Sequence, residues 1–217
     1  MKKFYLLPGI ILLLSLRLPA QSHNPFQREI DTIEKRYSAK AGSENLVIFT
    51  GSSSIRLWRD LERTFPGKNV INTGFGGSQM SDLLFFARNT ILKYKPAEVF
   101  IYEGDNDLAA GKKPSLIIAE ADSLIGIIRE ILPATTIVFL SAKPSPLRWK
   151  LRDHYLELNR LYSLLPSKYN NLRYIDLWTP LIGSDGKPVR QYYLADSLHL
   201  NRMGYSVWAE LVKKEIR

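Results

Sequence analysis

Five short apolar segments, rich in β-branched and aromatic residues, recur along this chain between stretches with helical spacing. The apolar segments cover residues 46–50, 69–72, 98–102, 136–140 and 172–175. The stretches that we expect to be helical cover residues 26–37, 55–65, 81–93, 114–131, 149–165 and 201–216. Strands that alternate with helices of this length are typical of βαβ units, in which helices cover both faces of a parallel sheet. The sequence therefore predicts an α/β three-layer sandwich with a parallel five-stranded sheet.

The first twenty residues differ from the rest of the chain. Lys2 and Lys3 precede a short apolar run, and the small residue Ala20 stands before Gln21. This pattern is typical of a secretory signal peptide, although an uncleaved N-terminal anchor is the alternative. We expect residues 1–20 to be a signal peptide and residues 21–217 to be a single domain. The protein would then be exported to the periplasm or secreted from a bacterial cell, without a stable membrane anchor after cleavage.

The cysteine count and the charge exclude several classes of protein. The chain has no cysteine, which excludes a disulfide scaffold, a thiolate zinc site and lipid attachment at a cysteine. Loss of Lys2, Lys3 and Arg17 with the signal peptide would lower the net charge from +9 to +6. The basic residues are scattered, whereas nucleic-acid binding favours a clustered stripe in a known module. We therefore expect no nucleic-acid partner.

A serine and a histidine-aspartate pair stand at two widely separated positions of the chain. Ser53 follows the first apolar segment, and Asp196 precedes His199 by three residues. An imidazole can accept a hydroxyl proton, and a carboxylate can orient the imidazole and stabilise its cation. Of the other two histidines, His23 lies near the start and His154 lies in a charged, helical stretch. The alternative role for Ser53 is to cap a helix.

Three polar or glycine-rich segments follow the first three predicted strands: residues 51–53, 74–77 and 104–107. In parallel sheets, ligands bind at the carboxyl ends of the strands. The backbone N–H groups of Ser53 and of Gly76 or Gly77, with the side-chain amide of Asn106, could therefore converge on one anion. The spacing matches neither the dinucleotide fingerprint nor the nucleophile elbow of the α/β-hydrolases.

The third of these segments is acidic: it contains Asp105 and Asp107, and Glu103 directly precedes it. Carboxylates at such spacing could bind a hard metal ion, but turn formation and helix capping are the more ordinary roles. We favour the ordinary roles and expect neither a metal nor a cofactor.

The same segments resemble the motifs of a known family, the SGNH (GDSL-type) hydrolases, over about residues 45–215. Residues 51–55 resemble the first motif block, Gly77 matches the glycine of the second, residues 104–107 resemble the third and residues 196–199 resemble the Asp-x-x-His block. Each block alone is weak, but the ordered set at strand ends is specific. The sequence is most similar to the branch like platelet-activating-factor acetylhydrolase, which has an Asn-x-Gly-x-Gly-Gly segment.

The resemblance implies a flavodoxin-like architecture and a serine-dependent carboxylic ester hydrolase that forms an acyl-enzyme. Ser53 would be the nucleophile, His199 the base and Asp196 its partner. Ser53, Gly77 and Asn106 would form the oxyanion hole, and no metal or cofactor would take part.

One position departs from the family pattern. The first block usually reads Gly-Asp-Ser, and Ser52 replaces the aspartate here. Since the expected nucleophile is the next residue, we expect this change to alter local hydrogen bonding without abolishing activity.

The expected substrate is a small-molecule or glycan ester with a short acyl group such as acetyl, because little chain remains for a lid. Trp58, Trp149, Tyr192 and Tyr193 could contact a sugar if they are exposed, and their alternative role is core packing. Two other functions stay open: a carbohydrate-binding or ligand-binding module without activity on the same fold, and a lysophospholipase or thioesterase. The sequence does not indicate an oligomeric state.

Overall fold

The computed structural model describes residue 1 and residues 24–217, so nearly all of the expected signal peptide lies outside the described residues. The centre of the fold is one five-stranded sheet in which all neighbouring strands are parallel. Its strands are β1 (Leu46–Gly51), β2 (Asn69–Asn72), β3 (Glu98–Tyr102), β4 (Thr136–Leu140) and β5 (Leu172–Ile175). The spatial order is β2-β1-β3-β4-β5, which is the flavodoxin-like order. The predicted fold class is confirmed.

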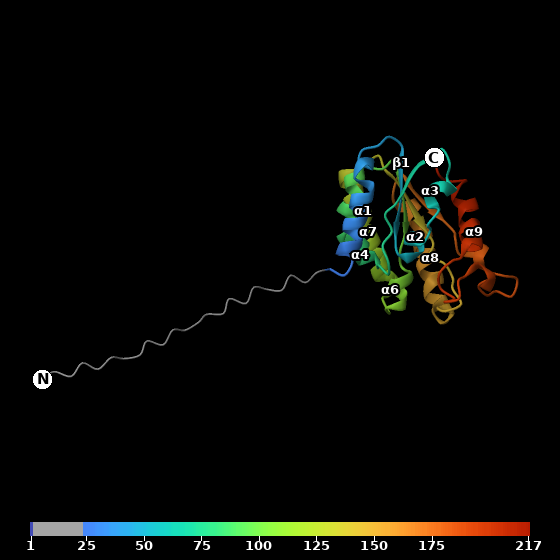
Figure 1. Ribbon diagram of the computed structural model, residues 1–217. Helices are drawn as coiled ribbons and strands as arrows, with labels where there is room; N and C mark the ends of the chain where they lie inside the picture. Colours follow the sequence, from blue (N-terminus) through green and yellow to red (C-terminus); the bar gives the residue numbers. More distant parts are fainter. Residues whose placement is uncertain (2–23) are drawn as a thin grey trace.

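Helices cover both faces of the sheet (Figure 1). One face carries α1 (Gln27–Tyr37), α4 (Met80–Phe85), α5 (Ala87–Thr90), α7 (Pro114–Ile131) and α8 (Arg152–Lys168). The other face carries α2 (Ser53–Arg56), α3 (Leu61–Thr64) and α9 (Arg202–Val212). The short helix α6 (Asp105–Ala109) follows β3. The elements of residues 24–217 also include five 3₁₀ turns: η1 (Ser38–Lys40), η2 (Leu92–Tyr94), η3 (Trp149–Leu151), η4 (Thr179–Leu181) and η5 (Arg190–Tyr192).

Each face of the sheet has its own apolar core. Along β1, Ile48 faces the core beneath α1 and α7, whereas Phe49 faces the core beneath α9. There the Phe49 ring stacks on Phe100 with 4.5 Å between ring centroids. Because both faces are covered, β1 and β3 are buried along their whole length, as is usual for parallel sheets. In the described part of the chain, no helix combines the length and the apolar character needed to cross a membrane.

Two predicted helices are broken in the structure. The stretch 55–65 forms α2 and α3 with a turn between them, because the side-chain amide of Asn72 donates to the backbone oxygen of Ile55 at 2.7 Å. The stretch 81–93 is divided into α4, α5 and η2. Buried Phe86 lies at the division with φ −95° and ψ 13°, outside the helical range.

A glycine at the end of β1 sets the position of the chain at the carboxyl edge of the sheet. Gly51 has φ +122°, and a Cβ atom there would lie 1.9 Å from the backbone oxygen of Tyr102. Only glycine permits this conformation and this close approach to β3. The chain therefore leaves β1 directly beside the end of β3 and begins α2 at Ser53.

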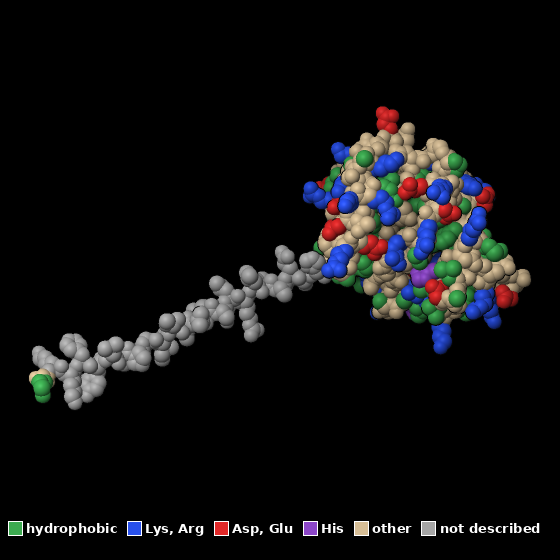
Figure 2. All heavy atoms as spheres, viewed as in Figure 1, with side chains coloured by type: hydrophobic (Ala, Val, Ile, Leu, Met, Phe, Trp, Pro, Cys, Tyr) green, Lys and Arg blue, Asp and Glu red, His purple; other side chains and the backbone are tan. Residues whose placement is uncertain are grey.

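On the face seen in Figure 2, basic and acidic side chains are interspersed over much of the domain surface, and a histidine lies at the surface near its lower edge.

Candidate active site

The Ser53 hydroxyl lies at the carboxyl edge of the sheet and contacts a histidine. Ser53 is the first residue of α2, and the helix cap is Ser52, so Ser53 does not have the capping role that the sequence left open. The distance from Ser53 Oγ to His199 Nε2 is 3.0 Å. Ser52 and Ser54 are buried, and their hydroxyl oxygens have no hydrogen-bond partner among the described residues. Of these three neighbouring serines, Ser53 is the one that reaches the imidazole.

The histidine that contacts Ser53 lies in a short loop, which carries both Asp196 and His199. Asp196 Oδ2 lies 2.7 Å from His199 Nδ1. The other carboxylate oxygen accepts hydrogen bonds from the backbone N–H groups of Leu198 at 2.9 Å and His199 at 3.0 Å. Partial burial would raise the pKa of Asp196, but the His199 side chain and the two N–H donors lower it to about 2. Asp196 is therefore ionised across the neutral range and presents a negative charge to the imidazole.

Local contacts hold this loop between η5 and α9. Tyr193 and Leu200 form an antiparallel bridge at its base, and the N–H of Leu194 donates to the backbone oxygen of His199 at 2.8 Å. The Asn201 side chain then caps α9 by accepting from two backbone N–H groups. The loop is thereby fixed at both ends, so the imidazole has a defined direction.

Three N–H donors of the predicted oxyanion hole are available for a ligand. The backbone N–H groups of Ser53 and Gly77 have no hydrogen-bond partner among the described residues. Gly77 is exposed with φ +78°, whereas the N–H of Gly76 donates to Glu29 at 2.9 Å and is occupied. Asn106 donates one amide hydrogen to the backbone oxygen of Ser78 at 2.9 Å, which leaves its second amide hydrogen unassigned. Such donors can stabilise a tetrahedral oxyanion.

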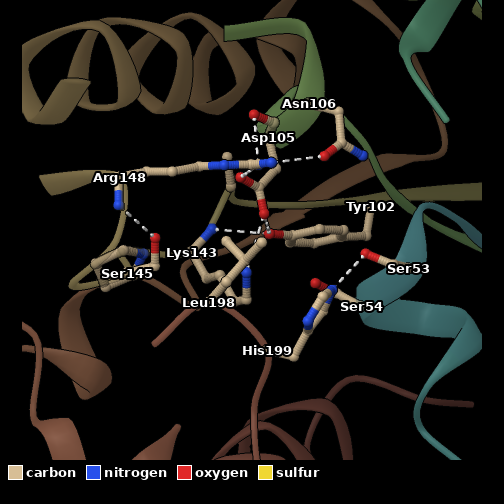
Figure 3. Close-up of polar contacts among 12 residues, drawn as sticks. Ser53, Ser54, Tyr102, Asp105, Asn106, Lys143, Ser145, Arg148, Leu198 and His199 are labelled. Carbon is tan, nitrogen blue, oxygen red and sulfur yellow. Dashed lines mark hydrogen bonds and ion pairs between the residues drawn. The ribbon is translucent and has the colours of Figure 1, made fainter. Parts of the chain in front are cut away.

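The carboxylate of Asp105 lies in a buried cluster of cations and tyrosines (Figure 3). Lys143 Nζ donates to Asp105 Oδ2 at 2.9 Å, and Arg148 and Tyr155 donate to Oδ1. The Tyr102 hydroxyl also donates to Oδ2, at 3.0 Å. Burial would raise the pKa of Asp105, but Lys143 and Arg148 hold it well below its usual range.

The two neighbouring carboxyls also have protein partners. Asp107 accepts from the backbone N–H of Met80 at the start of α4 and pairs with Lys112 at 2.7 Å. Glu103 is fully buried beside the Ser78 hydroxyl, and burial raises the pKa of Glu103 well above its usual value. Within residues 24–217, no group of three His, Asp or Glu side chains has the arrangement of a metal site.

The prediction did not foresee the roles of Lys143 and Arg148. Both lie in the loop after β4, and two basic residues at the carboxyl edge of the sheet were the available signal. The sequence left two roles open for four aromatic residues, sugar contact or core packing, and the structure divides them. Trp58 and Tyr193 are buried and pack in the core under α9, whereas Trp149 and Tyr192 are partly exposed.

Comparison with solved structures finds the same fold in bacterial proteins. A candidate platelet activating factor from Streptococcus pneumonia superimposes with a TM-score of 0.78 and 21% identity over 88% of this chain and 92% of that chain. A GDSL-like lipase from Bacteroides thetaiotaomicron superimposes with a TM-score of 0.73 and 21% identity, over 86% of this chain and 96% of that chain. An acetylxylan esterase from Geobacillus stearothermophilus superimposes with a TM-score of 0.67 and 17% identity, over 82% of this chain and 96% of that chain. Solved forms of that esterase include catalytic mutants in which a serine, an aspartate or a histidine is replaced.

Comparison of the sequence identifies the family. None of the curated proteins matches this sequence. The profile of the GDSL-like lipase/acylhydrolase family, in contrast, matches residues 38–207, which include every strand and every residue of the site described above. The chain therefore belongs to the GDSL-like lipase/acylhydrolase family and is an ester hydrolase.

Proposed function

We propose that this enzyme hydrolyses carboxylic esters through an acyl-enzyme formed on Ser53. The observation that carries the proposal is the continuous chain of contacts from Ser53 Oγ to His199 at 3.0 Å and from His199 to Asp196 at 2.7 Å. A hydroxyl, an imidazole and a carboxylate in this order can activate a nucleophile. The mutated serine, aspartate and histidine of the acetylxylan esterase provide a parallel on the same fold.

The proposed reaction has two steps. In the first, Ser53 Oγ attacks the ester carbonyl carbon while His199 Nε2 accepts the hydroxyl proton, and the protonated imidazole then gives that proton to the departing alcohol. In the second, water attacks the acyl carbon and loses a proton to His199, and the bond from that carbon to Ser53 Oγ then breaks. The imidazolium returns its proton to Ser53 Oγ as the carboxylic acid leaves, which restores the free enzyme. Asp196 stabilises the imidazolium in both steps, and one ester and one water yield one acid and one alcohol.

The negative oxygen of each tetrahedral intermediate would be held by three donors. These are the N–H groups of Ser53 and Gly77 and the free amide hydrogen of Asn106. Two observations support this assignment. The two backbone N–H groups have no hydrogen-bond partner among the described residues, and only one of the two amide hydrogens of Asn106 is used, in the bond to Ser78. Loss of one such donor typically costs roughly 3 kcal/mol in the transition state.

We further propose that the substrate carries a short acyl group, such as acetyl, on a small molecule or a glycan. The acetylxylan esterase on the same fold supports this substrate class. Of the four aromatic residues named from the sequence, Trp149 and Tyr192 are partly exposed and could contact a sugar ring. Trp149 stacks on Trp178 with 6.0 Å between the ring centroids, which holds it in place.

A series of p-nitrophenyl esters from acetate to palmitate tests both parts of the proposal. We expect the highest kcat/KM for acetate or propionate, and a maximum at long chains would favour a lysophospholipase instead. Ser53→Ala should lose activity, whereas Ser81→Ala, which changes an exposed serine on α4, should keep it.

Labelling locates the nucleophile independently of turnover. A fluorophosphonate should add its mass to the tryptic peptide of residues 41–56, which contains Ser53. Labelling at Ser78, or full activity of Ser53→Ala, would overturn the assignment. Because every proposed role is filled by a side chain or an N–H group, dialysis against EDTA should leave the activity unchanged.

We also propose that residues 1–20 direct export and are removed. The basic start, the apolar run and Ala20 before Gln21 support this. The mass of the protein recovered from the periplasm or the medium should correspond to residues 21–217, and a full-length mass in the membrane fraction would contradict cleavage.

A further inference from the structure

The loop after β4, residues 141–151, contacts both halves of the proposed site. On one side, the N–H of Leu147 donates to the backbone oxygen of Ser197 at 3.1 Å, within the loop that carries His199. The Tyr193 hydroxyl also donates to the backbone oxygen of Pro144 at 2.7 Å. On the other side, the Arg148 guanidinium reaches Asn106. The loop therefore connects the histidine-bearing segment to the segment that carries the side-chain donor.

Arg148 makes a forked contact with the first two residues of α6. Its Nη1 donates to the backbone oxygen of Asp105 at 2.9 Å and also to the Asp105 carboxylate. Its Nη2 donates to Asn106 Oδ1 at 3.0 Å. The N–H of Arg148 donates to Ser145 Oγ at 3.2 Å, which fixes the backbone from which the side chain extends. Figure 3 shows the guanidinium between the carboxylate and the carboxamide.

These partners determine which way the Asn106 carboxamide points. An arginine can only donate hydrogen bonds, so the group facing Arg148 must be the amide oxygen. A backbone carbonyl can only accept, so the group facing the Ser78 oxygen must be the NH₂. Both contacts require the same orientation. With Arg148 present, rotation of the amide would break the bonds to both Arg148 and Ser78. Without Arg148, only the bond to Ser78 would oppose a rotation that places the amide oxygen where the NH₂ now lies.

The charge of the cluster points the same way. Asp105 carries one negative charge, while Lys143 and Arg148 carry two positive charges, so a net positive charge remains beside Asn106. A cation that donates to the amide oxygen also polarises the amide and strengthens its N–H as a donor.

From this geometry we propose that Arg148 is a positioning residue of the ester hydrolase, which holds the Asn106 carboxamide with its N–H toward the oxyanion. This inference rests on the proposed function, because it assigns a purpose to a donor of the proposed oxyanion hole. It predicts that Arg148 acts on the transition state and that its effect passes through Asn106.

A double-mutant cycle with p-nitrophenyl acetate as the substrate tests this directly. Asn106→Ala should lower kcat by roughly 100-fold, as for other oxyanion donors. Arg148→Met should lower kcat by roughly 10-fold with KM changed by less than about twofold, because ground-state binding is not affected. In the Asn106→Ala background, Arg148→Met should lower kcat further by less than about twofold, because the group on which it acts is already gone.

The same 10-fold loss in both backgrounds would overturn the proposal, and so would a rise in KM at constant kcat. The first result would mean that Arg148 acts independently of Asn106, and the second that Arg148 contacts the substrate. The proposed function has a separate test in Ser53→Ala. If that variant remains active, the proposed function fails whatever the cycle shows.

Two further variants separate positioning from folding. Arg148→Lys keeps a cation for Asp105, but its single ammonium group lacks the planar fork that bonds two neighbours. We expect the midpoint of thermal unfolding of Arg148→Lys to lie within a few degrees of that of the wild type, and its kcat to be lower by at least about threefold. Full activity in this variant would contradict the proposal. Arg152→Met, which removes the exposed arginine of the adjacent α8, should leave kcat unchanged.

Discussion

Asp105 and Asp196 lie on the same ester hydrolase, and their surroundings are opposite. Asp105 is 4% exposed and is bonded to Lys143 and Arg148, which come from a loop about 40 residues further along the chain. Asp196 is exposed and is bonded to His199 and to two backbone N–H groups of its own loop. Both carboxylates are ionised, the first because buried cations surround it and the second because local donors do.

The difference separates two tasks. A buried carboxylate that is paired with two cations joins β3, α6 and the loop after β4, so its loss would leave uncompensated charge in the interior. The pair of exposed Asp196 and partly exposed His199 should contribute less to stability, because water screens its charges. Stability therefore depends on Asp105 and the proposed chemistry on Asp196, which makes the two aspartates separable by mutation.

The largest effect that we predict is on activity. Asp196→Asn should lower kcat/KM by roughly 10³- to 10⁴-fold, because the amide no longer stabilises the imidazolium or fixes the tautomer of His199. The midpoint of thermal unfolding should shift by no more than about 3 °C, since the side chain is exposed. Ester turnover and calorimetry on the same sample measure both quantities. A large loss of stability with little loss of turnover would reverse the roles that we give to the two aspartates.

For Asp105 we predict the opposite outcome. Asp105→Asn should lower the free energy of unfolding by about 3–5 kcal/mol, because Lys143 and Arg148 would remain buried without their counter-charge. Urea denaturation measures this loss, and Asp153→Asn, at an exposed position of α8, is the matched control. An equal, small effect at both positions would show that the buried cluster does not hold the fold together.

The pH dependence of stability gives a second view of the same carboxyl. The pKa of Asp105 is lowered in the folded state, so the unfolded chain takes up a proton first as the pH falls. The stability that Asp105 provides is therefore complete above its unfolded pKa of about 4 and is lost below it. In Asp105→Asn, the decrease in stability between about pH 5 and pH 3 should be smaller than in the wild type.

The sequence was sufficient to predict the fold and the residues brought together by short motifs. Asp196 and His199 are three residues apart, so their contact is a local property of one loop. The Ser53 contact spans 146 residues. The end of β1 predicts a serine at the edge where ligands bind in such sheets, and the resemblance to the first block of the family singles out Ser53 from its neighbours.

The contacts that could not be predicted involve buried charges from distant segments. Lys143 and Asp105 are 38 residues apart, and no local pattern indicates that a lysine after β4 becomes fully buried. The break between α2 and α3 was missed for a similar reason, because the Asn72 amide that bonds to Ile55 comes from the neighbouring strand. Helical spacing describes local preference and does not include such competition from elsewhere in the fold.

Glu103 extends the comparison to a buried carboxyl without a cation, and the predicted effect is smaller. Because burial raises its pKa, the folded state keeps the proton while the unfolded chain loses it as the pH rises above its ordinary value. The contribution of Glu103 to stability is therefore lost progressively as the pH rises above the ordinary pKa of a glutamate. Relative to the wild type, Glu103→Gln should therefore gain stability as the pH rises from 4 to 8. Thermal unfolding across this range measures the gain, and Glu157→Gln, which makes the same change at an exposed position of α8, is the matched control. A constant difference would mean that Glu103 is ionised in the fold.

The smallest effect concerns Ser52, where the family pattern has an aspartate and this chain has a neutral side chain. Ser52 is 1% exposed and is the residue before α2, yet its hydroxyl caps no N–H group and has no partner among the described residues. Removing a buried hydroxyl that bonds to nothing should be nearly neutral. We therefore expect Ser52→Ala to change the free energy of unfolding by less than about 0.5 kcal/mol and kcat/KM by less than about twofold.

Asn201 is the matched control for this prediction, because it precedes α9 and accepts from the N–H groups of Met203 at 2.9 Å and Gly204 at 3.2 Å. Asn201→Ala removes a functioning cap together with the hydrogen bonds that the side chain donates to the backbone oxygens of Gln191 and Tyr193, so it should cost at least about 1 kcal/mol. Urea denaturation of both variants under one set of conditions gives the comparison. An equal cost at the two positions would mean that the Ser52 hydroxyl is bonded after all. A near-zero cost at Ser52 alone would mean that its hydroxyl does not help to hold the start of α2 in place, and that the fold tolerates a neutral side chain where the family pattern has an aspartate.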